Sequence, residues 1–254
     1  MKWRGDYLYL VQNLVMKDFR IRYRNMSLGV LWSLLNPLIM MGVLTFVFTK
    51  FFQQPTPHFP LFILCGMVPY NFFTIAWLTG TNSIIDNAPL IKRIPVPREV
   101  VPITTVLACC IHLLVQIALL LSLAFLSGKG FNVQWLWMPV LWLLEIVFVC
   151  GLALLTSAFN VFVRDTRYMV ESANLVLFWL VPVFYSSDII PKPYLPIVDL
   201  NPVAATVISL RKILLNAQPP AALTLAKLVV VSFTVLAIGL MVFHRMKPRF
   251  YEHI

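Results

Sequence analysis

Six long apolar runs dominate this sequence of 254 residues and leave little of it for other structure. A helix that crosses a bilayer needs about 20 mostly apolar residues. By that measure we expect six membrane-spanning helices, of which the fifth is the least regular because it is short and contains Pro182. The runs cover residues 28–50, 59–80, 100–126, 134–161, 169–186 and 222–243.

Composition supports the same fold class. Apolar residues make up 60% of the chain and charged residues 12%, whereas a soluble domain carries about 25% charged residues. We therefore predict an all-α polytopic membrane protein with a single transmembrane domain over residues 1–254, and no room for a soluble catalytic domain.

The basic residues predict the orientation. An even number of spans places both termini on one side, and that side carries fourteen Lys and Arg against six on the other. Because cytoplasmic loops are enriched in Lys and Arg, we predict that both termini face the cytoplasm. The net charge of +10 does not indicate nucleic-acid binding, since the cations lie in short clusters at the ends of apolar runs.

Two segments outside the spans have unusual patterns. Residues 5–24 carry apolar side chains at helical spacing, which predicts an amphipathic helix in the cytoplasmic interface; the alternative is a disordered basic leader. Residues 187–221 are broken by prolines yet remain apolar. We predict that they form re-entrant helices between spans five and six and act as an outer gate.

Five patterns along the chain together resemble one family. They lie within residues 22–38, 66–73, 83–102, 163–165 and 182–202. The second reads GMVPYNFF, with tyrosine where tryptophan is commoner in that family. In this order and spacing, the patterns resemble those of permeases of ABC-type polysaccharide exporters, which export O-antigen, capsule or teichoic acid.

That resemblance implies a transport subunit of the bacterial inner membrane rather than an enzyme. It implies two copies of the permease, two copies of a separate ATPase that binds ATP and Mg²⁺, and a lipid-linked polysaccharide of O-antigen type as substrate. The chain itself lacks the GxxxxGK[ST] pattern that binds nucleotide phosphates. We therefore expect no cofactor in this chain.

Other classes of function fit less well. Within the ABC class, the alternatives are a permease for teichoic acid, capsule, a drug or a simple lipid. A lipid-phosphate glycosyl or phosphosugar transferase would need clustered carboxylates, whereas the acidic residues here are scattered. An ion-coupled carrier would need paired broken helices at the midplane.

The first cytoplasmic loop, residues 83–98, is the predicted coupling element. It is apolar as well as basic, and its prolines limit it to a short, stiff turn that suits the transmission of a push from an ATPase. The alternative is a solvated loop that only sets topology. The loop after the fourth span is a second candidate. The predicted coupling residues are Asn87, Leu90, Ile91, Lys92, Arg93, Arg98, Arg164 and Asp165.

Cations and aromatic residues are the predicted substrate contacts. Arg20, Arg22 and Arg24 lie at headgroup depth and suit a lipid diphosphate; alternatively, they only anchor the chain. Aromatic faces suit sugars, although each aromatic side chain can equally face lipid. The candidates that line the channel are Phe46, Phe48, Phe178, Trp179, Phe184 and Tyr185.

Polar residues within the spans are a separate group of candidates. His112 and Glu145 are placed at similar depth in neighbouring antiparallel spans, which predicts a polar pair. It would act as a structural hydrogen bond or, alternatively, as a proton relay. The four cysteines lie in apolar runs without metal-ligand spacing, so we expect no metal site.

Overall fold

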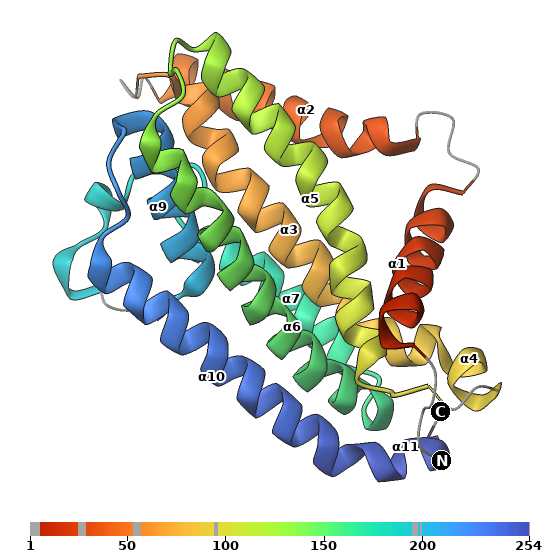
Figure 1. The fold of residues 1–254 in the computed structure, drawn as a ribbon. Coiled ribbons are helices and arrows are strands. Elements are labelled where there is room, and N and C mark those ends of the chain that lie inside the picture. Colours follow the sequence, from red (N-terminus) through yellow and green to blue (C-terminus); the bar gives the residue numbers. More distant parts are fainter. Residues whose placement is uncertain are drawn as a thin grey trace.

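The computed structural model describes residues 6–24, 29–52, 57–93, 96–194, 198 and 200–253 of the chain. These residues form helices and connections and contain no strand, so the predicted all-α class is confirmed. Figure 1 shows the long helices side by side, with both ends of the chain at the same end of the molecule. The principal helices are α1 Tyr7–Tyr23, α2 Trp32–Phe46, α3 Phe59–Asp86, α4 Ala88–Arg93, α5 Val100–Leu126, α6 Met138–Phe162, α7 Thr166–Leu180, α9 Pro202–Asn216, α10 Ala222–Met246 and α11 Phe250–His253.

Helix α3 is the centre of the bundle. It packs against α5 and α6 along its length, and also contacts α2, α7 and α9. Its side chains are mostly apolar, and those from Leu61 to Val68 are fully or nearly fully buried. A helix that is apolar on every side is expected at the core of a bundle rather than at its lipid-facing edge.

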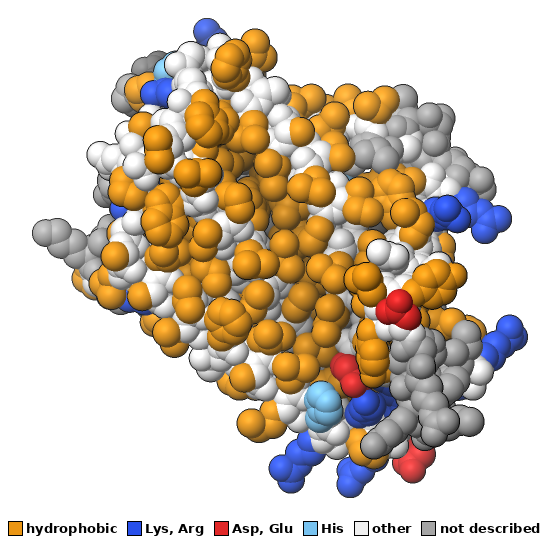
Figure 2. All heavy atoms as spheres, in the orientation of Figure 1, with side chains coloured by type: hydrophobic (Ala, Val, Ile, Leu, Met, Phe, Trp, Pro, Cys, Tyr) orange, Lys and Arg blue, Asp and Glu red, His pale blue; other side chains and the backbone are white. Residues whose placement is uncertain are grey.

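Five helical segments within the described residues are long and apolar enough to cross a membrane. They correspond to the first, second, third, fourth and sixth predicted spans. Figure 2 shows one apolar face, with charged side chains gathered toward opposite ends of the molecule. An apolar belt between two charged ends is the surface expected of a protein surrounded by lipid.

The fifth predicted span differs from the others. Helix α7 has 15 residues, which corresponds to a length of about 22 Å and is shorter than a bilayer core of about 30 Å. The helix stops at Val181, whose ψ of 131° is extended, because the following Pro182 disfavours helical geometry at the residue before it. A sixth crossing therefore requires the non-helical residues 181–186 to complete it, and it stays a prediction.

Helix α2 is attached differently from the central helices. It passes into a π-helical turn, Val47–Phe51, and contains Pro37 in its interior. Within α2 only Ser33 and Pro37 are buried, so its other apolar side chains are exposed or half-buried. Helix α1 lies beside the beginning of α5 (Figure 1), where Leu14 is buried.

Helices α6 and α10 approach each other closely through two glycines. A Cβ atom on Gly239 would lie 2.3 Å from the carbonyl oxygen of Gly151, and one on Gly151 would lie 2.6 Å from the backbone nitrogen of Leu236. Small residues at such crossings allow membrane helices to pack backbone against backbone. This contact fixes α10 against α6.

The predicted re-entrant segment, residues 187–221, lies partly outside the described residues. Its described part contains two short turns, Ser187–Ile189 and Lys192–Tyr194, followed by α9. Asn201 caps α9 by accepting a hydrogen bond from the backbone nitrogen of Val203 at 3.0 Å. Most of α9 is buried against α3, α6 and α10. Its role as an outer gate stays a prediction.

Candidate functional site

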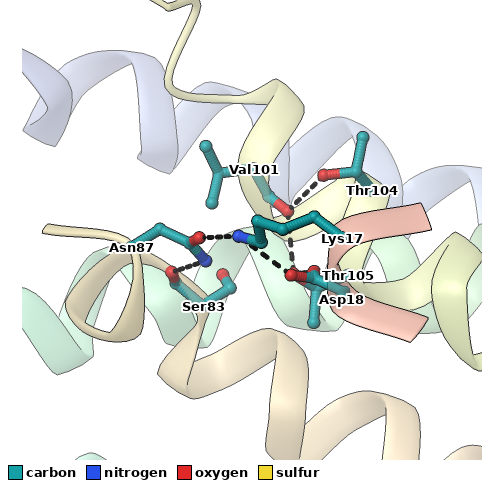
Figure 3. A network of polar contacts seen from close by, with 7 residues as sticks. All are labelled: Lys17, Asp18, Ser83, Asn87, Val101, Thr104 and Thr105. Atoms are coloured by element: carbon teal, nitrogen blue, oxygen red, sulfur yellow. Dashed lines mark hydrogen bonds and ion pairs between the residues drawn. The ribbon is translucent and has the colours of Figure 1, made fainter. Parts of the chain in front are cut away.

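A polar network joins α1 to the end of α3 (Figure 3). The Lys17 Nζ donates a hydrogen bond to Oδ1 of Asn87 and lies 3.0 Å from Oδ1 of Asp18. The side-chain nitrogen of Asn87 in turn donates to the carbonyl oxygen of Ser83 at 2.8 Å. Asn87 is the residue at which α3 gives way to α4, so α1 is linked directly to the turn between them.

The same network reaches α5. The hydroxyl of Thr105 lies 3.0 Å from Oδ2 of Asp18 and 3.1 Å from the carbonyl oxygen of Val101. One carboxylate oxygen of Asp18 therefore pairs with Lys17 of α1, and the other accepts a hydrogen bond from Thr105 of α5. A recess of about 360 Å³ opens beside this network and is bounded by α1, α3 and α5. Charged and amide side chains that link three helices can transmit a movement of one helix to the others.

Helix α4 has one buried residue and an exposed charged end. Ile91 is only 2% exposed and belongs to a small apolar cluster with residues of α3, α5, α6 and α10, including Ile84, Val101 and Phe243. Lys92 and Arg93 are exposed. The buried isoleucine holds the short helix against the bundle, while its cations remain accessible to another protein.

The chain after α4 is held by the carboxyl-terminal segment. The guanidinium of Arg98 donates to the carbonyl oxygen of Lys247 and lies 6.0 Å from the ring centroid of Phe250. The Nζ of Lys247 donates to the carboxylate of Glu99 at 2.6 Å. Burial raises the pKa of Glu99, but the hydrogen bond and charge of Lys247 outweigh it, so the pKa lies below its ordinary value.

The second loop that is predicted to be cytoplasmic lies near this site. Arg164 and Asp165 are exposed, and neither has a side-chain hydrogen bond or ion pair among the described residues. Arg167 forms an ion pair with Glu171 at 3.0 Å and is close enough to Asp86, at the end of α3, to interact with it electrostatically. Both predicted coupling loops therefore meet at one end of α3.

Comparison with known proteins decides the class. A profile of the family described as ABC-2 type transporter matches residues 9–215. The chain belongs to the ABC-2 type transporter family. One similar protein is the O-antigen export system permease protein RfbA of Klebsiella pneumoniae, which is 30% identical over 99% of this chain and 98% of its own length. The RfbA of Myxococcus xanthus is 28% identical over 98% of this chain and 96% of its own length. The polysialic acid transport protein KpsM of Escherichia coli is 25% identical over 91% of this chain and 90% of its own length.

In this ABC-2 transporter chain, two of the three predicted phosphate-binding arginines can be placed. Arg20 and Arg24 are exposed on α1 and, together with Lys17 and Asn13, line a shallow recess of about 460 Å³. The side chain of Arg22 lies outside the described residues. The recess therefore gathers three cations beside the polar network of Figure 3.

Five of the six predicted channel aromatics lie in one cluster around Phe184. The ring centroid of Phe184 lies 5.6 Å from that of Phe48, 5.7 Å from that of Phe178, and 5.3 Å from those of Trp179 and Tyr185. Phe184 itself is buried, whereas Trp179 is exposed. Phe46 is not part of this cluster and instead pairs with Phe51 at 5.6 Å.

The predicted pair of His112 and Glu145 is not formed. Glu145 is fully buried, and neither of its carboxylate oxygens has a hydrogen-bond partner in the described structure. His112 instead contacts the hydroxyl of Tyr23 at 3.1 Å and the side-chain nitrogen of Gln116 at 3.0 Å. Its side chain therefore lies on the face of α5 that meets α1. Similar depth in two antiparallel helices does not place side chains on facing sides.

Sequence reasoning missed Arg211 of α9. This arginine is only 8% exposed and donates to the carbonyl oxygens of Phe62, Val183 and Tyr185. It thereby fixes the extended segment that follows α7 against the beginning of α3. The two adjacent cations Arg211 and Lys212 within the mostly apolar residues 203–214 are a signal that could have identified it, since a charge in such a segment needs partners where it is buried.

Proposed function

We propose that this chain is the membrane-spanning subunit of an ATP-driven exporter that moves a lipid-linked polysaccharide of O-antigen type across the inner membrane. In this proposal both termini face the cytoplasm, and ATP with Mg²⁺ binds to a separate ATPase subunit. Membership of the ABC-2 type transporter family supports the class. The two relatives named as O-antigen export permeases, each similar over nearly its whole length, support the substrate.

One observation carries the mechanism: α4 is anchored by the buried Ile91 while Lys92 and Arg93 stay exposed. An ATPase that binds this charged surface would push on α4, and because Ile91 packs against neighbouring helices, the movement would reach them too. The connection of Asn87 to Lys17 would then pass the movement to α1. The exposed Arg164 and Asp165 extend the same docking surface.

Exposed apolar side chains support a second copy of the chain as partner. On α2 they include Trp32, Ile39 and Phe46, and on α7 they include Leu175 and Trp179. In a membrane such faces contact either lipid or another subunit. We propose that two copies meet through α2 and α7, and that two ATPase subunits bind below them.

The two groups of substrate candidates suit the two parts of a lipid-linked glycan. Arg20 and Arg24, in their shallow recess at the cytoplasmic end, suit the diphosphate, since guanidinium groups bind phosphate oxygens in pairs. The aromatic cluster around Phe184, at the end of α7, suits contact with the sugar rings of the glycan. The polysialic acid transport protein among the relatives makes a capsule-type glycan the second candidate, at lower identity and coverage.

Charge reversal on α4 tests the proposal. We predict that the double variant Lys92→Glu/Arg93→Glu, produced together with its ATPase, inserts into the membrane but loses most polysaccharide export. Both residues are exposed, so folding should be preserved, while the sign of the docking surface is inverted. The readouts are surface polysaccharide on cells and recovery of the ATPase with the purified permease.

The matched control is Lys50→Glu, which reverses an exposed charge at the predicted outer end. It should leave export and ATPase recovery unchanged. Normal export by the α4 variant would refute the coupling role. Export of a different class of molecule by an intact complex would instead refute the proposed substrate.

A further inference from the structure

A cavity of about 380 Å³ lies at the end of the molecule opposite the termini. Its walls come from the beginning of α3, the chain after α5, the segment after α7 and the end of α9. Cations and hydroxyl groups line it, and no Asp or Glu is among its described lining residues. The polar residues are His58, Lys129, Ser186, Ser187, Arg211, Lys212 and Asn216.

Arg211 gives the cavity a fixed positive charge. Three carbonyl oxygens hold its guanidinium, at 2.6–3.3 Å, and the ring of Phe62 lies 3.5 Å from its central carbon. Carbonyl oxygens orient the group but do not neutralise it. The guanidinium also keeps N–H donors that have no partner among the described residues. No carboxylate forms an ion pair with Arg211 in the part of the chain that the structure describes.

Two lysines add to this charge. Both are half-buried, and the Nζ of Lys129 donates to the carbonyl oxygen of Leu215 at 2.9 Å. Lys212 follows Arg211 directly on α9 and lines the same cavity. Neither lysine has an acidic partner among the described residues. Three like charges at a partly enclosed site repel one another, and a bound anion would remove that cost.

The charged network at the other end of the molecule has a different balance. There, Lys17, Lys247 and Arg167 each face a carboxylate within 3.0 Å. In Figure 2 the acidic side chains in view lie toward the end with the termini, whereas Lys, Arg and His side chains are visible at the opposite end. Among the described residues, no cation that lines the cavity around Arg211 pairs with a carboxylate.

We propose that this cavity is a binding site for an oxyanion of the phosphate type. Guanidinium and ammonium donors would surround the anion, and Ser186 and Ser187 line the same cavity. The volume accommodates one phosphate headgroup or one phosphorylated sugar. The phosphate group belongs either to an anionic lipid or to a soluble molecule. This inference does not depend on which molecule the protein exports.

The experiment uses the full chain, purified in detergent and separately in nanodiscs of phosphatidylcholine with phosphatidylglycerol. Binding of radiolabelled inorganic phosphate and pyrophosphate is measured by equilibrium dialysis, and retained phosphatidylglycerol by native mass spectrometry. We expect Lys129→Gln and Lys212→Gln each to weaken binding about tenfold, because each removes one charge-assisted hydrogen bond. Lys212→Arg should bind as the wild type does.

The two arms distinguish the sources of the phosphate. Saturable phosphate binding that the glutamine variants weaken supports a soluble anion. Phosphatidylglycerol that stays with the wild type and is lost from the same variants supports a lipid headgroup. The control Lys50→Gln should change neither readout. If the wild type retains neither probe, or if both glutamine variants bind as the wild type does while remaining folded, the proposal is wrong.

Discussion

The two ends of the bundle use cations in different ways. At the end with the termini, Lys17 contacts Asp18 and Asn87, and Lys247 contacts Glu99, so each lysine meets a carboxylate. At the opposite end, Arg211 donates to carbonyl oxygens and lies against the ring of Phe62, and it has no carboxylate partner among the described residues. The first arrangement joins helices through side chains from separate elements. The second holds extended backbone in place and leaves a net positive charge among the described side chains that line the cavity.

This difference separates two tasks. Ion pairs and amide contacts between α1, α3, α5 and the carboxyl-terminal segment connect the parts that a cytoplasmic ATPase would move. The arginine at the other end replaces the backbone hydrogen bonds that the chain loses when α7 stops at Val181. Buried carbonyl groups need such partners because unsatisfied ones are costly away from water.

The largest expected effect comes from removing the arginine. Arg211→Met should destabilise the protein by about 2–4 kcal/mol, because three buried carbonyl oxygens lose a charged donor at once. Arg211→Lys should fall between this variant and the wild type, since one ammonium cannot reach all three oxygens in the same plane. Thermal unfolding in detergent, followed by tryptophan fluorescence, measures the change.

The neighbouring Lys212→Met is the matched control for the arginine variant. Lys212 is half-buried and donates no hydrogen bond within the described residues, so its loss should cost little. Equal stability of Arg211→Met and the wild type would mean that residues 183–185 do not depend on the arginine. The contrast between the two ends of the bundle would then fail.

Much of the fold follows from apolar patterns in the sequence. The run at 100–126 predicts α5 with its bounds, and the stripe at 5–24 predicts α1 within two residues. The fifth span is the exception, because its length depends on how the backbone continues beyond Pro182. That continuation is set by Arg211, which lies far along the chain and gives no periodic signal.

The candidate site was predictable only in part. Apolar and basic residues beside prolines predict a short, stiff turn in the loop of residues 83–98, whereas residues 88–93 form the helix α4, with Ile91 buried and Lys92 exposed. The contact of Lys17 with Asn87 could not be inferred, because it depends on the direction in which α1 packs against α5. For the same reason, depth alone wrongly paired His112 with Glu145.

A smaller effect is expected at the network of Figure 3. Lys17→Met and Asn87→Leu should each reduce ATP-driven export several-fold while the complex still assembles, because the link between α1 and α4 is lost. A double-mutant cycle should give a coupling energy of about 0.5–1.5 kcal/mol in thermal stability. Gln12→Leu is the control, since Gln12 is exposed on α1 and is not among the residues that line the recesses beside this network. Additive effects of the two substitutions would show that the contact does not connect the helices.

The smallest effect concerns the ion pair of Glu99 with Lys247. The folded-state pKa of Glu99 is lowered, because Lys247 outweighs the effect of burial. The pair should therefore stabilise the protein fully above the unfolded pKa of about 4.3, and this contribution should disappear as the pH falls through the lowered folded value. Both side chains are partly exposed, so the contribution should stay below about 1 kcal/mol.

Thermal unfolding between neutral and acidic pH tests this prediction. Glu99→Gln should be less stable than the wild type at neutral pH and should approach it in acid. Glu252→Gln, at an exposed residue of α11, should follow the wild type throughout. A constant difference between Glu99→Gln and the wild type at every pH would show that Glu99 acts through packing rather than charge. In that case, the pairing of lysines with carboxylates would not distinguish this end of the bundle from the other.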